Sequence, residues 1–212
     1  KPASPGNAFV IEVNAAPGIR MHHYPTAGKP RDVAGDIVDY LFPDRGDGRI
    51  PIIAVTGTNG KTTVTRMISH IWQLAGYCVG MTTTDGIFIN GQCVVTGDTT
   101  GPDSARVVLT EPTVEVAVLE TARGGVMRGG LAYDYSDVGI VTNITEDHLG
   151  QDGIEDLEDL AFIKSLVLET IKPGGVALIN ADDQYAAYLT GRATCEVVYF
   201  SLAPNNIIVR RH

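Results

Sequence analysis

Residues 50–64 read IPIIAVTGTNGKTTV, and this stretch decides the fold of the chain. Its first half is a run of apolar, mostly β-branched residues that suits a buried parallel strand. Gly57 and Gly60 then let the backbone turn its N–H groups inward around an anion, and a helix follows from residue 61. The partial positive charge at the start of that helix favours phosphate. The sequence therefore predicts a strand, a phosphate-binding loop and a helix in succession.

Side chains after the second glycine add the chemistry of nucleotide binding. Lys61 can reach the β- and γ-phosphates of a nucleotide, and a hydroxyl of Thr62 or Thr63 can ligate Mg²⁺. The common form of this loop has a glycine five residues before Gly60, but the chain has Val55 there, so it carries the shorter Gly-x-x-Gly-Lys-Thr form. The predicted nucleotide contacts are Gly57, Thr58, Asn59, Gly60, Lys61, Thr62 and Thr63.

Composition narrows the class of protein. The chain has 212 residues, 44% of them hydrophobic, and a formal net charge of −9. It exceeds one typical domain of ~100–150 residues but is too short for two large ones. The acidic balance argues against a nucleic-acid partner, and the apolar runs are only strand-length, which argues against a membrane span. An odd number of cysteines without metal-like spacing favours reduced thiols and a cytoplasmic protein.

A Pro/Gly-rich linker at 43–48 divides the chain into residues 1–48 and 49–212, and the first part, which starts without Met, reads as a piece of something longer. After the linker, strands and helices alternate, which predicts an α/β fold with a mostly parallel sheet, helices on both faces and ligands at the C-terminal strand ends. An Asn90-Gly91 turn signals a hairpin, which we expect as an excursion from the sheet. We expect strands near 51–56, 77–82, 114–119, 137–142, 175–180 and 196–200, and helices near 61–75, 102–110, 155–172 and 182–190.

Polar side chains follow two of these strands. Glu120 comes directly after the strand 114–119, where a carboxylate suits Mg²⁺, although a solvated strand-capping Glu is the alternative. Asn143 through His148 follow the strand ending at 142. His148 could be a metal ligand or a base, or an ordinary loop residue.

Two arginines lie in the Gly-rich segment after Glu120. Arg123 and Arg128 could hold a carboxylate or a phosphate, and for each a surface role is an equal alternative.

Lys164 falls in the middle of the apolar face of the helix near 155–172. A lysine there is costly unless it is paired or chemically changed. Its side chain could extend to the edge of the face. Alternatively its amine, more readily deprotonated when desolvated, is carbamylated and lies near the metal.

Together the segment 56–63, Glu120, Asn143 through His148, and Lys164 resemble the central ATPase domain of the Mur ligases, over residues 50 to about 200. The resemblance implies an enzyme that uses ATP to convert a carboxylate into an acyl phosphate, which an amine attacks to form an amide. It implies that Lys61 contacts the β/γ-phosphates and that Asn143 lies on the nucleotide side. It further implies that Thr62 and Glu120 serve one Mg²⁺, that His148 serves a second, and that Lys164 is carbamylated.

The N-terminal part carries a second resemblance. In the segment VIEVNAAPG at residues 10–18, Glu12 and Asn14 would share one side of a strand and offer two oxygens to one cation, unless they are incidental polar residues before a Pro-Gly turn. The segment is similar to the closing strand of ATP-grasp ligases, where Glu and Asn at this spacing bind Mg²⁺.

An ATP-grasp tail followed by a Mur-like domain resembles the cyanophycin synthetase family. That resemblance implies ATP, a poly-aspartate or cyanophycin chain, Asp and Arg as partners, with the Mur-like site joining Arg to each β-carboxylate, and a homo-oligomer in the full-length protein. The chain departs from the family pattern because most of the ATP-grasp domain and the C-terminal Mur domain are missing. We therefore expect little activity from these residues alone.

Alternatives remain open. Another Mur-type ligase, acting on a cell-wall precursor or a folate, is disfavoured by the Glu12–Asn14 segment. A GTPase-like switch lacks an Asn-Lys-x-Asp motif for guanine. A non-catalytic nucleotide-binding scaffold is the third alternative.

Overall fold

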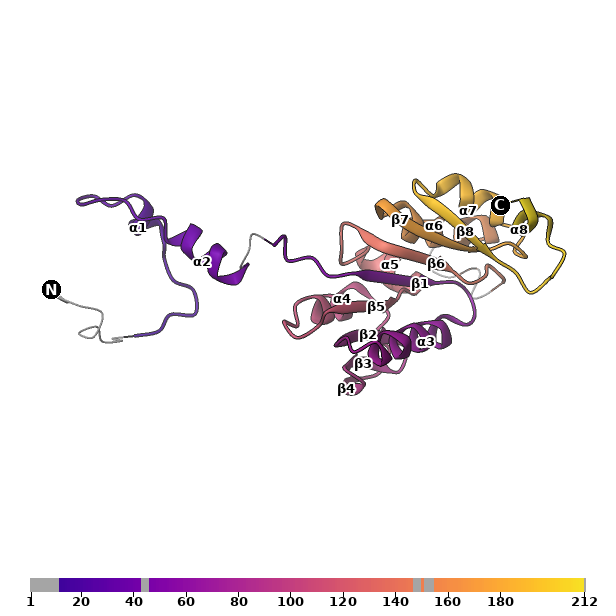
Figure 1. The fold of residues 1–212 in the computed structure, drawn as a ribbon, viewed down its shortest axis with the longest axis horizontal. Helices are drawn as coiled ribbons and strands as arrows, with labels where there is room; N and C mark the ends of the chain where they lie inside the picture. Colours follow the sequence, from indigo (N-terminus) through magenta and orange to yellow (C-terminus); the bar gives the residue numbers. More distant parts are fainter. Residues whose placement is uncertain (1–11, 43–45, 147–149, 151–154, 212) are drawn as a thin grey trace. The chain divides into compact units, whose positions relative to one another are not determined.

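The computed structural model describes residues 12–42, 46–146, 150 and 155–211. The chain divides into two compact units, residues 1–49 and residues 50–212 (Figure 1). Among the described helices, none combines the length and apolar character that a bilayer crossing requires.

The described part of the first unit contains two short helices, α1 (Arg20–His23) and α2 (Val33–Leu41). Asp32 caps α2 by accepting a hydrogen bond from the Gly35 amide at 2.9 Å. The expected strand at Glu12 and Asn14 is wrong for the described residues 12–14, which have no strand conformation. A strand requires a neighbouring strand, and the described part of this unit contains none.

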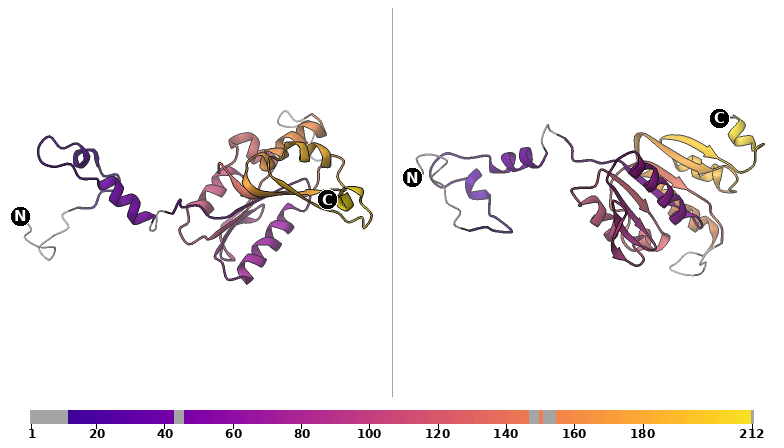
Figure 2. Two further views of the ribbon diagram at one scale, coloured as in Figure 1. Left: turned by 45° about the horizontal axis from the view of Figure 1, so that its top comes forward. Right: turned by 60° about the horizontal axis from the view of Figure 1, so that its bottom comes forward.

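The second unit is built on an eight-stranded sheet with the order β4-β3-β2-β5-β1-β6-β7-β8. Strands β2, β5, β1, β6, β7 and β8 pair in parallel, while β3 pairs antiparallel with β2 and β4 (Figure 2). The strands are β1 (Ile52–Thr56), β2 (Val79–Thr83), β3 (Gly86–Ile89), β4 (Gln92–Thr96), β5 (Val116–Glu120), β6 (Ser136–Val141), β7 (Ile171–Asn180) and β8 (Glu196–Phe200).

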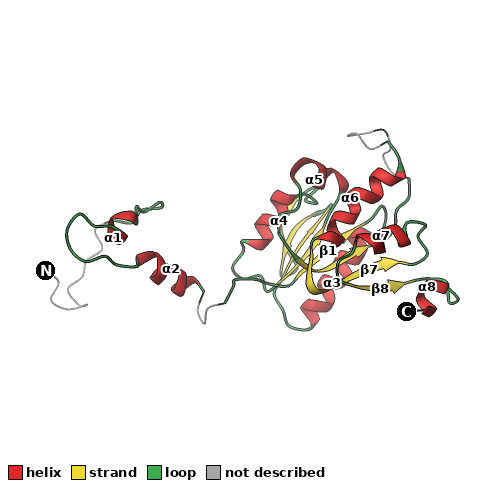
Figure 3. Ribbon diagram, turned by 90° about the horizontal axis from the view of Figure 1, so that it is seen from above, coloured by secondary structure: helices red, strands yellow, loops and turns green. Residues whose placement is uncertain are grey.

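Helices cover both faces of this sheet, as the alternating pattern predicts. Figure 3 shows α3 on one side of the strands and α4, α5 and α6 on the other. The helices are α3 (Lys61–Leu74), α4 (Pro102–Leu109), α5 (Arg123–Gly129), α6 (Leu157–Glu169), α7 (Ala186–Arg192) and α8 (Ile207–Arg211). The mostly parallel α/β fold is therefore confirmed.

The alternating direction of side chains along the central strands explains how the sheet packs against a helical layer on each face. In β1, Ile53 and Val55 pack with Val64 and Ile68 of α3, whereas Ile52 lies in the cluster that contains Val108 of α4. Successive side chains of a strand point to opposite faces, so one continuous apolar run serves both helical layers.

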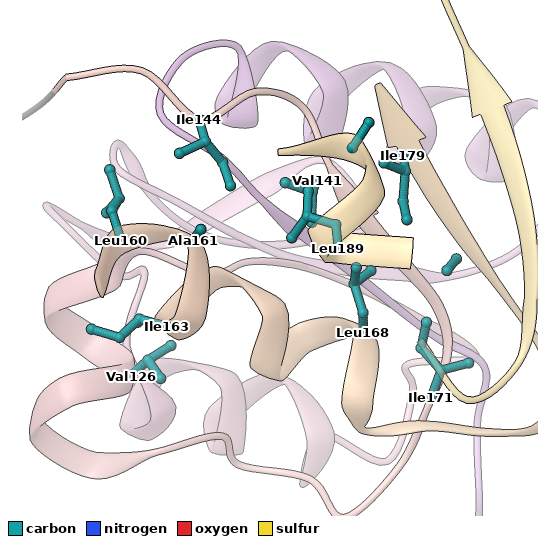
Figure 4. Close-up of a cluster of buried hydrophobic side chains, with 12 residues drawn as sticks. Val126, Val141, Ile144, Leu160, Ala161, Ile163, Leu168, Ile171, Ile179 and Leu189 are labelled. Atoms are coloured by element: carbon teal, nitrogen blue, oxygen red, sulfur yellow. The ribbon is translucent and has the colours of Figure 1, made fainter. Parts of the chain in front are cut away.

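A third cluster lies under α5, α6 and α7 and includes Leu160 and Leu168 of α6 and Leu189 of α7 (Figure 4). Asp156 caps α6, its carboxylate accepting the amides of residues 158 and 159, both at 2.9 Å. The helix therefore begins at 157 and ends at 169, shorter than the expected 155–172.

Three expectations need correction. The hairpin is not an excursion but extends the sheet, because β3 pairs with β2 over residues 80–83 and 86–89. Strand β7 begins at Ile171 rather than 175. Helix α5 forms within the Gly-rich segment, which was not among the expected helices, since its packing against α4 and α6 offsets the poor helix propensity of glycine.

The third cluster allows a test of packing. Leu168 is fully buried, so Leu168→Ala should lower the free energy of unfolding by about 2–5 kcal/mol, measured by urea titration. The matched control is Leu202→Ala at a side chain that is 98% exposed, which should change stability by less than about 0.5 kcal/mol. Equal losses for the two variants would contradict the assigned core.

Candidate functional site

The loop between β1 and α3 depends on two glycines. Gly57 has φ +142° and Gly60, which caps α3, has φ +84°. A Cβ at residue 57 would collide with the hydroxyl of Thr142, which follows β6. The tight turn and the close approach of the neighbouring strand end both require glycine at 57.

Asn143 holds this loop in place. Its Oδ1 accepts the Asn59 amide and its Nδ2 donates to the Asn59 carbonyl, both at 3.0 Å. Its backbone carbonyl accepts the Thr58 amide at 2.8 Å. The Thr58 hydroxyl donates to the Thr145 carbonyl and accepts the Thr145 amide, both at 3.1 Å. These bonds engage the amides of Thr58 and Asn59, so an anion would be met by the first amides of α3, which have no partner within the helix.

Two lysines converge on successive carbonyls of the loop. Lys61 Nζ donates to the Thr58 carbonyl at 2.9 Å, and Lys164 Nζ donates to the Gly57 carbonyl at 2.8 Å. Lys164 is only 4% exposed, so the sequence-based prediction of a lysine on the core face of α6 is confirmed. The Lys61 ammonium and the start of α3 favour an anionic ligand beside this loop.

A cavity of about 230 Å³ lies where these lysines meet. Its lining comprises Gly57, Lys61, Asp98, Ala122, Arg123, Gly124, Leu160 and Lys164. The phosphate loop, the segment after β5 and the middle of α6 therefore all line one cavity.

Glu120 ends β5 beside the start of α3. Its Oε2 accepts the Thr62 hydroxyl at 2.9 Å and the Thr84 amide at 3.4 Å, and the Thr62 and Thr84 hydroxyls lie 3.2 Å apart. Glu120 is 2% exposed, and its Oε1 has no hydrogen-bond partner among the described residues. A buried carboxylate oxygen without a partner is costly, which marks it as a position for a cation or another donor.

Burial raises the pKa of the Glu120 carboxyl above its ordinary value of 4.5. The Thr62 hydroxyl, the charge of Lys61 and the Thr84 amide act in the opposite direction, while the charge of Asp98 adds to the rise in pKa. A cation beside Oε1 would favour the ionised form.

The structure separates the two threonines that the sequence left as alternatives. The side chain of Thr62 faces Glu120, whereas that of Thr63 is exposed. His148 lies outside the described residues. Glu12 and Asn14 belong to the first unit, where Asn14 Nδ2 donates to Glu12 Oε1 at 3.1 Å and both side chains are exposed.

Sequence reasoning missed Thr84 and Asp98. Thr84 follows β2, and β2 is the neighbour of β5 in the sheet, so the strand order alone places it against Glu120. In the sequence, the run Thr82-Thr83-Thr84 at a strand end could have indicated Thr84 as a site residue. Asp98 follows β4 and had no motif of its own.

A larger hollow of about 500 Å³ is lined in part by Asn143. It is lined by Asn143, Ile144, Thr145, Glu146, Leu157, Asn180, Asp182, Asp183 and Gln184. Asn143 therefore borders this hollow while both polar atoms of its side chain hold the loop.

Comparisons with known proteins identify relatives of this chain. Cyanophycin synthetase of Synechocystis sp. is 52% identical over all 212 residues, which make up 24% of that protein. UDP-N-acetylmuramoylalanine–D-glutamate ligase of Pelotomaculum thermopropionicum is 32% identical over 92% of this chain and 39% of its own length. The chain spans about a quarter of the length of the cyanophycin synthetases that it matches.

The fold has solved counterparts. The structure of a UDP-N-acetylmuramoyl-L-alanyl-D-glutamate–2,6-diaminopimelate ligase superposes with a TM-score of 0.62 at 26% identity, covering 80% of this chain and 35% of that one. The model of the Mur ligase middle domain matches residues 55–211, which include the loop, Glu120, Asn143 and Lys164. The chain therefore belongs to the Mur ligase middle domain family.

Proposed function

We propose that residues 49–212 are the ATP-using domain of an amide ligase of the cyanophycin synthetase type, which joins Arg to the β-carboxylate of a poly-aspartate chain. The observation that carries the proposal is the convergence of Lys61 and Lys164 on one cavity beside the unpartnered oxygen of Glu120. The 52% identity to a cyanophycin synthetase over the whole chain supports the choice of reaction.

Phosphate contacts come from the loop at 57–63. The first amides of α3 and Lys61 meet the β- and γ-phosphates, and Asn143 keeps the loop open by binding Asn59 on both sides. The hollow that Asn143 lines gives the rest of the nucleotide a place to lie.

The Glu120–Thr62 pair fits a magnesium ion. Carboxylate and hydroxyl oxygens are the ligands that Mg²⁺ prefers, and Glu120 Oε1 is buried without a donor among the described residues. When bound, Mg²⁺ supplies charge that stabilises the phosphoryl group in transfer. His148 remains our candidate for a second ion.

Lys164 is proposed to be carbamylated. Its neutral amine attacks CO₂, a C–N bond forms, one C=O bond of CO₂ opens to a carboxylate, and the amine proton leaves to solvent. The product is an anion whose oxygens face the cavity that Lys164 lines.

The reaction then runs in two steps. A β-carboxylate oxygen attacks the γ-phosphorus, and the bond to the bridging oxygen breaks to release ADP. The neutral amine of Arg attacks the acyl carbon, inorganic phosphate leaves, and the amine loses a proton to a base that the described residues do not identify. Lys61 and the helix amides stabilise negative charge in both steps.

Residues 1–48 are proposed to be the C-terminal segment of an ATP-grasp domain that adds Asp, with Glu12 and Asn14 as its Mg²⁺ ligands. The match to cyanophycin synthetase includes these residues. Partners are then ATP, Asp, Arg and the growing polymer, in a homo-oligomeric enzyme of the cytoplasm.

Another Mur-type ligase is the second candidate, favoured by the 32% identity to a D-glutamate-adding enzyme. It predicts that a UDP-linked cell-wall precursor and D-glutamate, rather than poly-aspartate and Arg, stimulate ATP hydrolysis.

The decisive assay uses the full-length protein that carries this chain. With ATP and a short poly-aspartate primer, we expect a mass gain that depends on Arg and falls at least ~100-fold in Lys61→Ala, because phosphate charge is no longer stabilised. Lys29→Ala, at an exposed lysine of the first unit, is the control. Unchanged Arg addition in Lys61→Ala would contradict the proposal.

Glu120→Gln tests the metal site in the 212-residue chain. We expect the apparent affinity for Mg²⁺ in the presence of an ATP analogue to fall roughly tenfold or more, measured by calorimetry. Glu196→Gln on β8, where the side chain is exposed, should leave this affinity unchanged.

The Glu120→Gln variant should also change how the stability of the chain depends on pH. A raised pKa means that the metal-free native state holds the Glu120 proton more tightly than the unfolded state, so stability falls as pH rises through the raised pKa. Glu120→Gln should show a smaller loss of thermal stability between about pH 4 and about pH 7 than the unchanged chain. A larger loss would contradict the assignment.

Carbamylation is tested by carbon-13 NMR of the chain in labelled bicarbonate with Mg²⁺ and nucleotide. We expect a carbamate signal that is absent in Lys164→Arg and retained in Lys172→Arg. An unmodified ammonium under these conditions would rule the carbamate out.

A further inference from the structure

The segment 142–145, which binds the phosphate loop, is bound in turn by residues at the end of β7. Asn180 is the last residue of β7, and its Nδ2 donates to the Thr142 carbonyl at 3.0 Å. Asp183 lies in the turn that follows, and its Oδ2 accepts the Ile144 amide at 2.6 Å. The two bonds join residues 38 and 39 positions apart in the chain, so they form only when β6 and β7 lie side by side.

These bonds continue a ladder that the backbone has ended. Strands β6 and β7 pair in parallel as far as Val141 and Ile179, which lie next to each other in Figure 4. Beyond that pair, side chains from the end of β7 supply the hydrogen bonds to the chain that leaves β6. A chain loosens most easily where a paired strand ends, so bonds at this point restrict the segment 142–145.

Ile144 lies between two residues that contact the phosphate loop. Asn143 binds the backbone of Asn59, and Thr145 binds the hydroxyl of Thr58. The Ile144 side chain is buried, and the bond to its amide fixes the peptide between these two neighbours. Any movement of that peptide would therefore be transmitted to the loop from both sides.

Both side chains at the end of β7 are held in one orientation by their own turn. Asn180 Oδ1 accepts the Asp182 amide at 2.9 Å, so Nδ2 is the atom turned towards the end of β6. Asp183 Oδ1 accepts the Tyr185 amide at 2.8 Å, which leaves Oδ2 for Ile144. Position 183 therefore needs two acceptor oxygens, and an amide side chain offers only one. A carboxylate also forms the stronger bond, because it is charged.

We propose that Asn180 and Asp183 are positioning residues of the nucleotide site, which act through the segment 142–145 to hold the phosphate loop in the form that binds an anion. They do this without contacting the phosphates. The inference rests on the proposed function only in that the loop binds the phosphates of ATP. Both residues also line the hollow of about 500 Å³ beside Asn143, so direct contact with the nucleoside is the competing explanation.

Tripolyphosphate separates these explanations, because it has the phosphates of ATP but neither base nor ribose. Calorimetry with Mg²⁺ compares its affinity for the chain with that of a non-hydrolysable ATP analogue. In Asp183→Asn we expect both affinities to fall by the same factor, roughly tenfold, because the lost bond acts through the loop. Asn180→Asp should behave alike, since it turns an acceptor towards the Thr142 carbonyl. Glu196→Gln is the charge-matched control for Asp183→Asn and should leave both affinities unchanged.

Amide hydrogen exchange distinguishes a loosened loop from a destabilised domain. The amides of Thr58 and Asn59 donate to Asn143, and in both variants we expect them to exchange roughly tenfold faster, while the amides of β5 keep their rates. Equal acceleration in the loop and in β5 would mean that Asn180 and Asp183 stabilise the whole domain, which overturns the positioning role.

The binding outcomes are equally distinct. A loss confined to the ATP analogue would assign the two side chains to the nucleoside and overturn the inference, as would unchanged affinities for both ligands, and either result leaves the proposed ligase reaction intact. No binding of either ligand by the unchanged chain overturns the inference together with the proposed nucleotide site. Equal losses here, with no Arg addition by the full-length protein, would support the inference and overturn the ligase reaction alone.

Discussion

The clamp between the phosphate loop and the segment after β6 is the constraint on which the site depends. Asn143 binds the backbone of Asn59 on both sides, and the Thr142 hydroxyl leaves no room for a side chain at residue 57. These contacts join residues more than eighty positions apart in the chain. They aim the loop carbonyls at Lys61 and Lys164 and leave the first amides of α3 for an anion. The clamp therefore converts a flexible glycine-rich turn into a preorganised binding surface.

Buried charge is the second organising feature. Glu120 and Lys164 are both almost fully enclosed, on the last residue of a central strand and on the core face of α6. Such groups lower stability unless they are paired, and Glu120 Oε1 has no hydrogen-bond partner among the described residues. The raised pKa of Glu120 reflects the same cost.

The order of the parallel strands in the sheet brings the residues of the site together. The strands β2, β5, β1 and β6 are neighbours in the sheet, so Thr84, Glu120, Gly57 and Asn143 come together at one edge although the chain visits them in another order. Ligands gather at this edge in open α/β sheets. The helices α4 and α5 that follow β4 and β5 then enclose a cavity next to it.

By itself, the sequence determined the local elements and the class of chemistry. The apolar run at 52–55 and the glycines and lysine after it specify strand, loop and helix through backbone sterics and burial, which act over a few residues. The core position of Lys164 follows from helical periodicity in the same way. Only the tertiary structure decided that Thr62 rather than Thr63 meets Glu120, that Asn143 clamps the loop, that Thr84 joins the site, and that the hairpin extends the sheet. Those contacts depend on which strands lie side by side, and strand order is set by packing across the whole domain, a long-range property that no local pattern of residues encodes.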